Sequence, residues 1–423
     1  MRRAAATVVE PTLGIRVLVV APFPPRPDAP DGGIKSVAYF VAELARRHDV
    51  GLVALRAEHE PPVPESLRNV CEFVEEFERD GRGASRGARF GSRARLSAGA
   101  VRGEPIWATM LASAACRRGV RKLVAEWSPD IVQVEFHVMG QYARGLGSAR
   151  PVVVLTEHEP GRYAGVPRAG EFGSTGLIRS LDRSAWTRYE QRLLANIDAT
   201  VTFTDEDRTT LHELAGDVRI ETIPLGVYVP PAALDPVGSD AGVLFVGSFS
   251  HPPNVDAAVR LLDRVMPLVH RSVPEATLEI VGGWPGGPQR ENVLMSGHVE
   301  NMGAVLDKAA VVVAPVDTGG GMRVKVIEAL AAGKAVVTSS RGARGLSVTA
   351  GRELVLAETD EEFADAIVEL LRDSERRAAI GTAARSWVLA NLSWERTVDA
   401  YTELYRELLR ERRGRQREAG DTR

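Results

Sequence analysis

Short β-branched runs alternate with helix-patterned segments along most of this chain, and this alternation limits its fold more than any other feature. The strand-like runs of the first half are Arg16–Ala21, Val50–Leu55, Asp130–Glu135, Pro151–Thr156 and Ala199–Thr204. Helical patterns lie between or after them, at Ile34–Arg47, in a segment that closes at Leu123–Ala125, at Trp186–Ala195 and at Asp205–Leu214. Two parallel strands need a long crossover, usually a helix. The alternation therefore predicts βαβ units and a doubly wound parallel sheet.

The same pattern restarts after Val229–Ala241, a segment rich in proline, glycine and aspartate. The strand-like runs are now Gly242–Gly247, Ala276–Val281, Val293–Gly297, Ala309–Ala314 and Ala335–Thr338, and the helical patterns are Val255–Val269 and Val324–Ala332. The sequence therefore predicts an α/β protein of two facing Rossmann-like domains, residues 1–228 and 242–392, joined by a linker at 229–241. Since ligands bind at the carboxyl ends of parallel strands, we expect the strand-end loops of both domains to line a cleft between them.

Composition excludes several classes of function. The net charge of -3 gives no reason to expect nucleic acid as the main partner. Cys71 and Cys116 are the only cysteines, and they form neither a metal site nor a disulfide framework. No apolar run reaches the roughly 20 residues of a spanning helix. Glu10 and Pro11 interrupt the apolar N-terminus, which argues against a signal peptide. We expect a cytoplasmic protein.

One region departs from the α/β pattern. Arg79–Arg102 combines small residues with a single acid, Asp80, and with seven arginines: Arg79, Arg82, Arg86, Arg89, Arg93, Arg95 and Arg102. A solvated surface loop is the simpler interpretation. The alternative is a basic patch that contacts anionic lipid or an anionic acceptor, which would make the protein peripheral at the inner face of the membrane. The charged end of the chain, Arg410–Arg423, is expected to fray.

The segment Ala314–Leu346 has the residue pattern that most strongly indicates a ligand-binding site. A β-branched run leads into three glycines, Gly319, Gly320 and Gly321, and then into a helical pattern that carries Arg323, Lys325 and Glu328. A glycine turn before a helix presents backbone N–H groups to an anion. Cations at a helix N-terminus oppose the helix dipole unless an anion binds there, so we expect a diphosphate at this point. The alternative is an ordinary βα turn with a surface Lys–Glu pair.

The order and spacing of several segments resemble the retaining glycosyltransferases of the GT-B fold, family 4. The similarity covers most of the chain. The segments that carry it are Gly32–Gly33 and the following helix, DIVQVEFH (Asp130–His137), VVVLTEHEPG (Val152–Gly161), VTFTDEDRTTL (Val201–Leu211), IPLGV (Ile223–Val227), LFVGSFSHPPNVDAAVRLLDRVMP (Leu244–Pro267), GGGMRVKVIEALAAGKAVV and GARGL (Gly342–Leu346). The family usually has two glutamates eight positions apart across the glycine turn.

This resemblance implies a set of donor-binding residues. Glu328 matches the second family glutamate and is expected near the nucleotide ribose. Gly320 stands where the first glutamate is common, so the hydroxyls of the donor sugar would be held by Asp317 or by the backbone N–H groups of the three glycines. The family's usual cations fall in Ser248–Asn254, which has none; we expect Arg323 and Lys325 to contact the β-phosphate instead. Ser248 could reach phosphate from that loop.

The N-terminal domain would supply the other side of the site. Gly32 and Gly33 resemble the family's glycine loop, which approaches the donor phosphate and the acceptor. His158 ends a strand where the family often has a histidine near the reacting sugar, and His137 could line the acceptor side. A structural histidine is the simpler interpretation of each when taken alone. Trp394 resembles the start of the family's last helix, which returns to the N-terminal domain.

We therefore expect a retaining, metal-independent hexosyltransferase. It would move a sugar from a nucleoside diphosphate sugar, its co-substrate, to a hydroxyl on a glycan, a lipid-linked molecule or a small molecule. No cofactor is expected. Because the first family glutamate is missing, a catalytically silent sugar-nucleotide-binding subunit is an alternative. A GT-B epimerase is a third, with Glu157 and Glu159 as its only candidate acid and base residues. The nucleotide, the sugar and the acceptor stay open.

Overall fold

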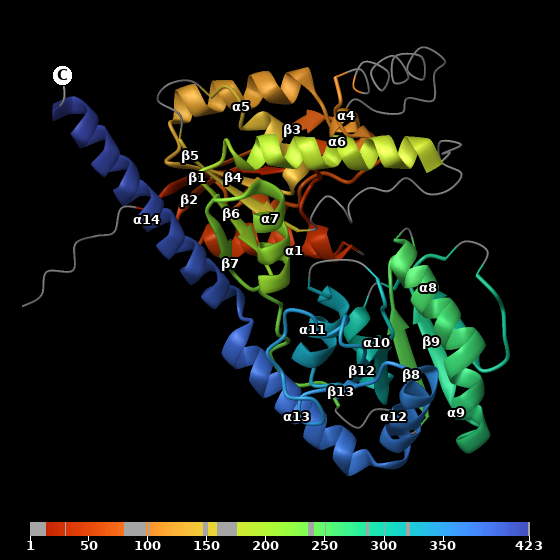
Figure 1. The fold of residues 1–423 in the computed structure, drawn as a ribbon. Helices are drawn as coiled ribbons and strands as arrows, with labels where there is room; N and C mark the ends of the chain where they lie inside the picture. Colours follow the sequence, from red (N-terminus) through yellow and green to blue (C-terminus); the bar gives the residue numbers. More distant parts are fainter. Residues whose placement is uncertain are drawn as a thin grey trace, which may run out of the picture.

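The protein consists of two α/β domains stacked one above the other, with a long C-terminal helix that runs from their junction along the N-terminal domain (Figure 1). This computed structural model describes residues 14–29, 31–79, 99, 102–146, 151–158, 176–235, 241–249, 251–284, 287–299, 301–318 and 322–421. The basic arginines 82, 86, 89, 93 and 95 and the glycines 319 to 321 lie outside these residues, as do Glu159 and Ser250. Within the described part, no helix is both long enough and apolar enough to cross a membrane.

The N-terminal domain is built on a seven-stranded, all-parallel sheet in the order β3-β2-β1-β4-β5-β6-β7. Its strands are β1 (Arg16–Ala21), β2 (Asp49–Arg56), β3 (Phe73–Glu78), β4 (Ile131–Glu135), β5 (Val152–Glu157), β6 (Ala199–Thr202) and β7 (Ile220–Thr222). Its helices are α1 (Gly32–Leu44), α2 (Glu65–Arg68), α4 (Ile106–Met110), α5 (Ala114–Trp127), η1 (His137–Tyr142), α6 (Gly176–Leu194) and α7 (Asp205–Ala215). The central strands are buried and mostly apolar because helices cover both faces of the sheet, although β4 and β5 also carry four buried polar residues, Gln133, Glu135, Thr156 and Glu157.

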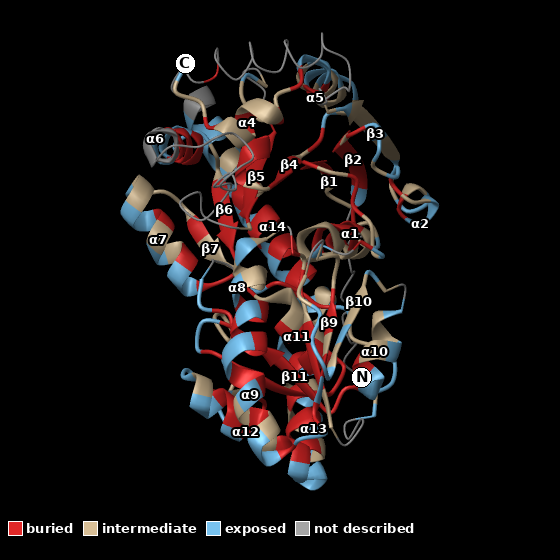
Figure 2. Cartoon of the chain, turned by 90° about the vertical axis from the view of Figure 1, so that its right-hand side faces the viewer, coloured by how far each residue is buried: buried red, intermediate tan, exposed pale blue. Residues whose placement is uncertain are grey.

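The C-terminal domain repeats this topology with a six-stranded parallel sheet in the order β10-β9-β8-β11-β12-β13. Its strands are β8 (Gly242–Val246), β9 (Thr277–Val281), β10 (Val293–Gly297), β11 (Val311–Ala314), β12 (Ala335–Thr338) and β13 (Val355–Leu356). Its helices are α8 (Pro252–Arg260), η2 (Leu261–Val265), α9 (Met266–Ser272), α10 (Met302–Lys308), α11 (Val324–Ala331), α12 (Asp360–Arg372) and α13 (Ser374–Asn391). Figure 2 shows the buried strands of each domain at its centre, with the exposed residues on the outer helices. The prediction of two doubly wound parallel domains is confirmed.

The last helix, α14 (Trp394–Asp421), crosses from the C-terminal domain back to the N-terminal one (Figure 1). Its inner face carries apolar and aromatic residues that join the core beneath β1 and β4: Val398, Tyr401, Leu404, Tyr405 and Leu408. The prediction that Arg410–Arg423 frays is wrong, because α14 continues to Asp421. Arg219 holds this end, at 2.7 Å from Glu407 and 2.8 Å from Glu411.

The two domains meet at the carboxyl ends of their strands. Arg344 of the C-terminal domain lies 3.1 Å from the buried carboxylate of Asp207 in the other domain. At Gly345 a Cβ atom would lie 2.5 Å from the Thr204 side chain, so the Gly345 backbone lies directly against that side chain. The strand-end loops of the two sheets therefore face each other.

Candidate active site

The N-terminus of α11 presents two cations at the edge of the C-terminal domain. Val326, Ile327 and Leu330 form the buried face of the helix and fix it on the sheet. Arg323 occupies the N-cap position, and its Nη2 donates a hydrogen bond of 2.9 Å to the carbonyl of Thr318. This contact ties the guanidinium to the segment that follows β11, close to the N-terminus of α11, where a helix can bind an anion.

Lys325 reaches across to the first turn of α8, the helix that follows β8. Its Nζ donates to Asn254 Oδ1 at 2.5 Å and lies 4.7 Å from the centre of the Phe245 ring. Asn254 in turn donates to the carbonyl of Ser248 at 2.8 Å. Although the whole residue is only partly buried, burial of the amine and, to a smaller extent, the charge of Arg323 lower the pKa of Lys325 to about 7. The amine thus joins the loop with Ser248 to the start of α11.

Glu328 faces the N-terminal domain. Its Oε1 lies 3.1 Å from the Nζ of Lys35, which α1 places one turn after the glycine pair. Tyr39 follows on the same helix, and burial raises its pKa, with a smaller contribution from Glu328. Sequence reasoning missed Lys35 as a site residue. Its position, two residues after Gly33 in a helix facing the other domain, was the available signal.

Asp317 forms an ion pair with Arg260, which the sequence did not suggest. Arg260 Nη1 donates to both of its carboxylate oxygens, at 3.0 and 3.2 Å. The buried guanidinium also donates to Asp360 Oδ1 at 2.6 Å. Asp317 therefore has a structural partner, and a sugar hydroxyl would have to share its oxygens with Arg260.

The glycine pair at the start of α1 lies against the other domain. Asp31 caps the helix, and its Oδ1 accepts from the amides of Gly33 at 2.9 Å and of Ile34 at 3.3 Å. At Gly32 a Cβ atom would stand 2.9 Å from Cβ of Val324, the first residue of α11. Position 32 thus has no room for a side chain, and the missing Cβ lets the two helix N-termini approach.

His158 lies directly after β5 in a narrow pocket between the N-terminal sheet, α1 and α14. The pocket is lined by Ser36, Phe40, Glu135, Thr156, His158, Phe203, Leu225, Trp394, Thr397 and Tyr401. The imidazole stacks on Phe136, with ring centres 3.8 Å apart and planes 6° apart. Its Nε2 lies 2.8 Å from Glu135 Oε2. A predicted site residue is therefore rigidly held by partners that the sequence did not reveal.

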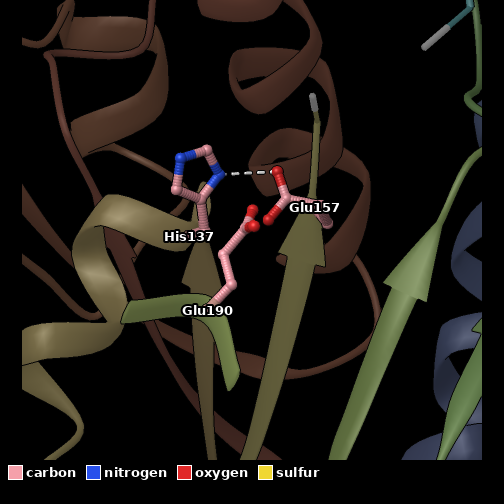
Figure 3. A group of neighbouring side chains, drawn as sticks. All are labelled: His137, Glu157 and Glu190. Atoms are coloured by element: carbon pink, nitrogen blue, oxygen red, sulfur yellow. Dashed lines mark hydrogen bonds and ion pairs between the residues drawn. The ribbon is translucent and has the colours of Figure 1, made fainter. Parts of the chain in front are cut away.

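His137 lies on the opposite face of the same sheet (Figure 3). It is fully buried, packs edge-on against Trp186 and places Nδ1 2.6 Å from Glu157 Oε1. Glu190 completes a buried group whose ligand atoms lie within 4.8 Å of one another. His137 and Glu157 thus form a directly hydrogen-bonded histidine–carboxylate pair in the core. This burial argues against the predicted acceptor contact of His137. Strand alternation sends the Glu157 side chain to the face opposite His158.

The two halves of the chain match the models of two glycosyltransferase domains. The model described as "Glycosyl transferase 4-like domain" matches residues 31–226, and the one described as "Glycosyl transferases group 1" matches residues 240–373. Two facing Rossmann-like domains define the GT-B class of folds. Together with these matches, they show that the chain belongs to the GT-B glycosyltransferases of the family 4 type.

Individual relatives agree with this membership. A GDP-mannose-dependent alpha-(1-6)-phosphatidylinositol monomannoside mannosyltransferase of Mycolicibacterium smegmatis is 27% identical over 89% of this chain and 94% of its own. A GDP-mannose-dependent monoacylated alpha-(1-6)-phosphatidylinositol monomannoside mannosyltransferase of Corynebacterium glutamicum is 34% identical over 32% of this chain and 40% of its own. The match thus spans about two fifths of the first curated relatives' length. The solved sucrose-phosphate synthase of Thermosynechococcus elongatus shares the fold, with a TM-score of 0.67, 17% identity and coverage of 94% of this chain and 100% of that one.

Proposed function

We propose that this protein is a hexosyltransferase that moves a sugar from a nucleoside diphosphate sugar to a hydroxyl acceptor, with retention and without a divalent metal. The observation that carries the proposal is the contact between Lys325 and Asn254. It holds a cation of the first turn of α11 against the first turn of α8, next to Val324, which lies against Gly32 of the other domain. A diphosphate at this point would meet Lys325, Arg323 and the N-terminus of α11.

These groups have defined roles in the proposed reaction. The bond from the anomeric carbon to the diphosphate breaks, and its electron pair leaves with the diphosphate. Arg323 and Lys325 stabilise the developing negative charge, as preorganised cations and N–H groups do in a cleft. The acceptor oxygen forms the new bond on the face that the diphosphate leaves, and the acceptor proton passes to the departing phosphate. Glu328 would hold the ribose, and His158 would orient hydroxyl groups near the reacting carbon.

The relatives suggest which substrates to test first. Two of them are named for GDP-mannose as donor and for a phosphatidylinositol mannoside as acceptor. We therefore propose GDP-mannose as the first donor to test and a lipid-linked mannoside as the first acceptor. A cytoplasmic protein that meets such an acceptor would work at the inner face of the membrane, and the basic segment 79–102 is our candidate for that contact.

The first experiment is a thermal-shift screen against UDP, GDP, TDP and ADP sugars in the presence of EDTA. A ligand that binds only the native state at 100 times its Kd stabilises it by about 2.7 kcal/mol, which is readily measured. We expect one nucleotide to raise the Tm and the matching sugar nucleotide to support transfer. Arg323→Ala and Lys325→Ala should abolish transfer while the fold survives. Near-normal turnover in both variants would contradict the phosphate contact.

A silent sugar-nucleotide-binding subunit is the second candidate. It is favoured by one observation, that the carboxylates of Asp317 and Glu328 are both paired with protein cations. In that case a nucleotide sugar would raise the Tm, but the purified protein would neither transfer nor hydrolyse the sugar.

A further inference from the structure

His158 is the end of a chain of buried hydrogen bonds that begins on the C-terminal helix. The phenol of Tyr405 donates to Gln133 Oε1 at 2.8 Å. Gln133 Nε2 donates to Glu135 Oε1 at 2.8 Å and to Thr156 Oγ1 at 2.7 Å. The second oxygen of Glu135 lies 2.8 Å from His158 Nε2. This chain of hydrogen bonds links α14 to the pocket that contains His158. Its residues come from segments that lie far apart in the sequence.

The chemistry of these groups fixes the direction of every bond. Only the NH₂ of Gln133 can face the carboxylate of Glu135, since a carbonyl oxygen there would be repelled. The carbonyl oxygen of Gln133 must then accept from Tyr405. Burial, together with the nearby charge of Glu135, raises the pKa of Tyr405 well above its ordinary value, so that the phenol keeps its proton. The orientation of the whole chain is thereby set from α14 toward His158.

Glu135 determines which ring nitrogen of His158 carries the proton. The carboxylate is almost fully buried and is stable there only as an acceptor of charge-assisted hydrogen bonds. Its second oxygen therefore requires a donor, which is the Nε2–H of His158. In the neutral imidazole, Nδ1 is then an acceptor, and no hydrogen bond joins Nδ1 to any residue in the described part of the chain. Phe136 stacks on the ring and Phe203 packs edge-on at 5.0 Å, so the ring is clamped.

We propose that Glu135 is a positioning residue of this enzyme, which with Gln133 and Tyr405 holds His158 as the Nε2–H tautomer with Nδ1 as a hydrogen-bond acceptor. Nδ1 accepts a hydrogen bond from a hydroxyl of the bound sugar or of the acceptor. This inference rests on the proposed function and deepens it, because it makes the C-terminal helix part of the site. The competing explanation is a buried polar network that only stabilises the fold.

The test is an isosteric variant, Glu135→Gln, examined by ¹⁵N NMR of the histidine ring nitrogens. Gln133 still presents its NH₂ to position 135, so the new amide must turn its oxygen toward Gln133 and its own NH₂ toward His158. Nε2 must then accept, and the imidazole proton moves to Nδ1. We expect the Nε2–H tautomer in the wild type and the Nδ1–H tautomer in Glu135→Gln, at alkaline pH where the ring is neutral. The signals are assigned by their loss in His158→Asn.

A matched control is Glu157→Gln on the neighbouring strand. It changes a second buried histidine–carboxylate pair, that of His137, at the same end of the sheet. This control should change the signals of His137 and leave those of His158 as in the wild type. An unchanged His158 tautomer in Glu135→Gln, or an Nδ1–H tautomer in the wild type, would overturn the inference.

Kinetics provides the second readout. A wrong histidine tautomer removes an acceptor that the transition state needs, and such groups contribute about 10²–10⁴-fold. We expect Glu135→Gln to lower kcat by at least about 100-fold, with the donor KM within about threefold of wild type. A tautomer change with normal kcat would show that the network is only structural. The NMR measurement needs no substrate, so the His158 tautomer can be determined whether or not the protein is active. If the wild-type protein has no transferase activity, the proposed function and the hydroxyl contact are refuted, but the prediction of the tautomer is still tested.

Discussion

Lys325 shows how much of a charged residue's behaviour is set by its surroundings. A lysine amine in water has a pKa near 10.4, and burial lowers that of Lys325 to about 7. Asn254 accepts one of its hydrogen bonds and Phe245 lies beneath it, but neither is an anion. At neutral pH the Lys325 amine is therefore only partly protonated, and a bound diphosphate would favour its protonated, charged form.

The affinity for a nucleoside diphosphate should accordingly depend on pH with a definite sign. Below pH 7 Lys325 is already charged, so affinity is at its highest. Above pH 7 a proton must be taken up on binding, and affinity should fall by up to about tenfold per pH unit. Calorimetric titration from about pH 6 to 9 measures this. Lys325→Met should bind more weakly and without this slope; an equal slope in that variant would assign the effect to another group.

Glu328 tests whether a paired carboxylate also serves the donor. If it holds the ribose, Glu328→Ala should weaken nucleotide binding by roughly ten- to a hundredfold, since a hydrogen bond to a charged group contributes about 1.5–3 kcal/mol. Lys35→Met removes the same ion pair but keeps the carboxylate, and both partners are partly exposed, so it should change affinity little. An equal loss in the two variants would mean that the ion pair, and not a ribose contact, carries the effect.

At the scale of single residues, the sequence could identify groups that lie near one another in the chain. Arg323, Lys325 and Glu328 share one short helix, and their chemistry could be argued from its pattern. Their partners could not, because Lys35 is 293 positions from Glu328 and Asn254 is 71 positions from Lys325. Such contacts depend on domain packing, which residue periodicity does not describe.

At the scale of elements, the first turns of α1 and α11 form one of the close contacts between the two domains. A methyl group at Gly32 would meet three atoms of Val324, at 2.9 to 3.1 Å, which is closer than side chains pack. These two turns belong to opposite domains and flank the proposed diphosphate. Their separation therefore controls whether both domains can contact the donor at once.

Gly32→Ala should hold the cleft open and lower kcat/KM about tenfold, because closure would have to overcome about 1–3 kcal/mol of overpacking. Val324→Ala removes two of the three clashing atoms, so the double variant should recover part of the loss. Small-angle scattering with and without nucleotide would report closure. The control is Gly414→Ala in α14, where an added Cβ meets nothing within 4 Å. Simple additivity of Gly32→Ala and Val324→Ala would contradict a direct contact.

Elements with strong periodicity were predictable, and weak ones were not. The central strands of both sheets are mostly apolar runs, so their positions and their parallel direction could be predicted from the sequence. Strand β3, with the sequence FVEEFE, was missed because it lies at the sheet edge and carries three glutamates. Strands β7 and β13 have only three and two residues, too few for any pattern.

At the scale of the whole molecule, the N-terminal domain depends on the last residues of the chain. Helix α14 supplies Val398, Tyr401, Leu404, Tyr405 and Leu408 to its core. Burying a large apolar side chain stabilises a fold by about 1.5–3 kcal/mol. Five such residues contribute on the order of 10 kcal/mol, which equals the entire stability of a typical domain. The N-terminal domain is therefore completed by the end of the chain, although the rest of the C-terminal domain separates α14 from it in sequence.

Removal of α14 should consequently unfold the N-terminal domain and leave the C-terminal one intact. We expect a chain that ends at Leu392 to lose the amide protection of β1 and β4 in hydrogen exchange, while β8 and β11 remain protected, because no residue of α14 beyond Trp394 packs in the C-terminal core. Addition of a peptide with residues 394–421 should restore the protection. A peptide of the same length with Tyr401→Ser and Tyr405→Ser should not, since it lacks both buried rings and the donor to Gln133. Full protection of β1 in the truncated chain would show that the N-terminal sheet is stable alone and that α14 only covers it.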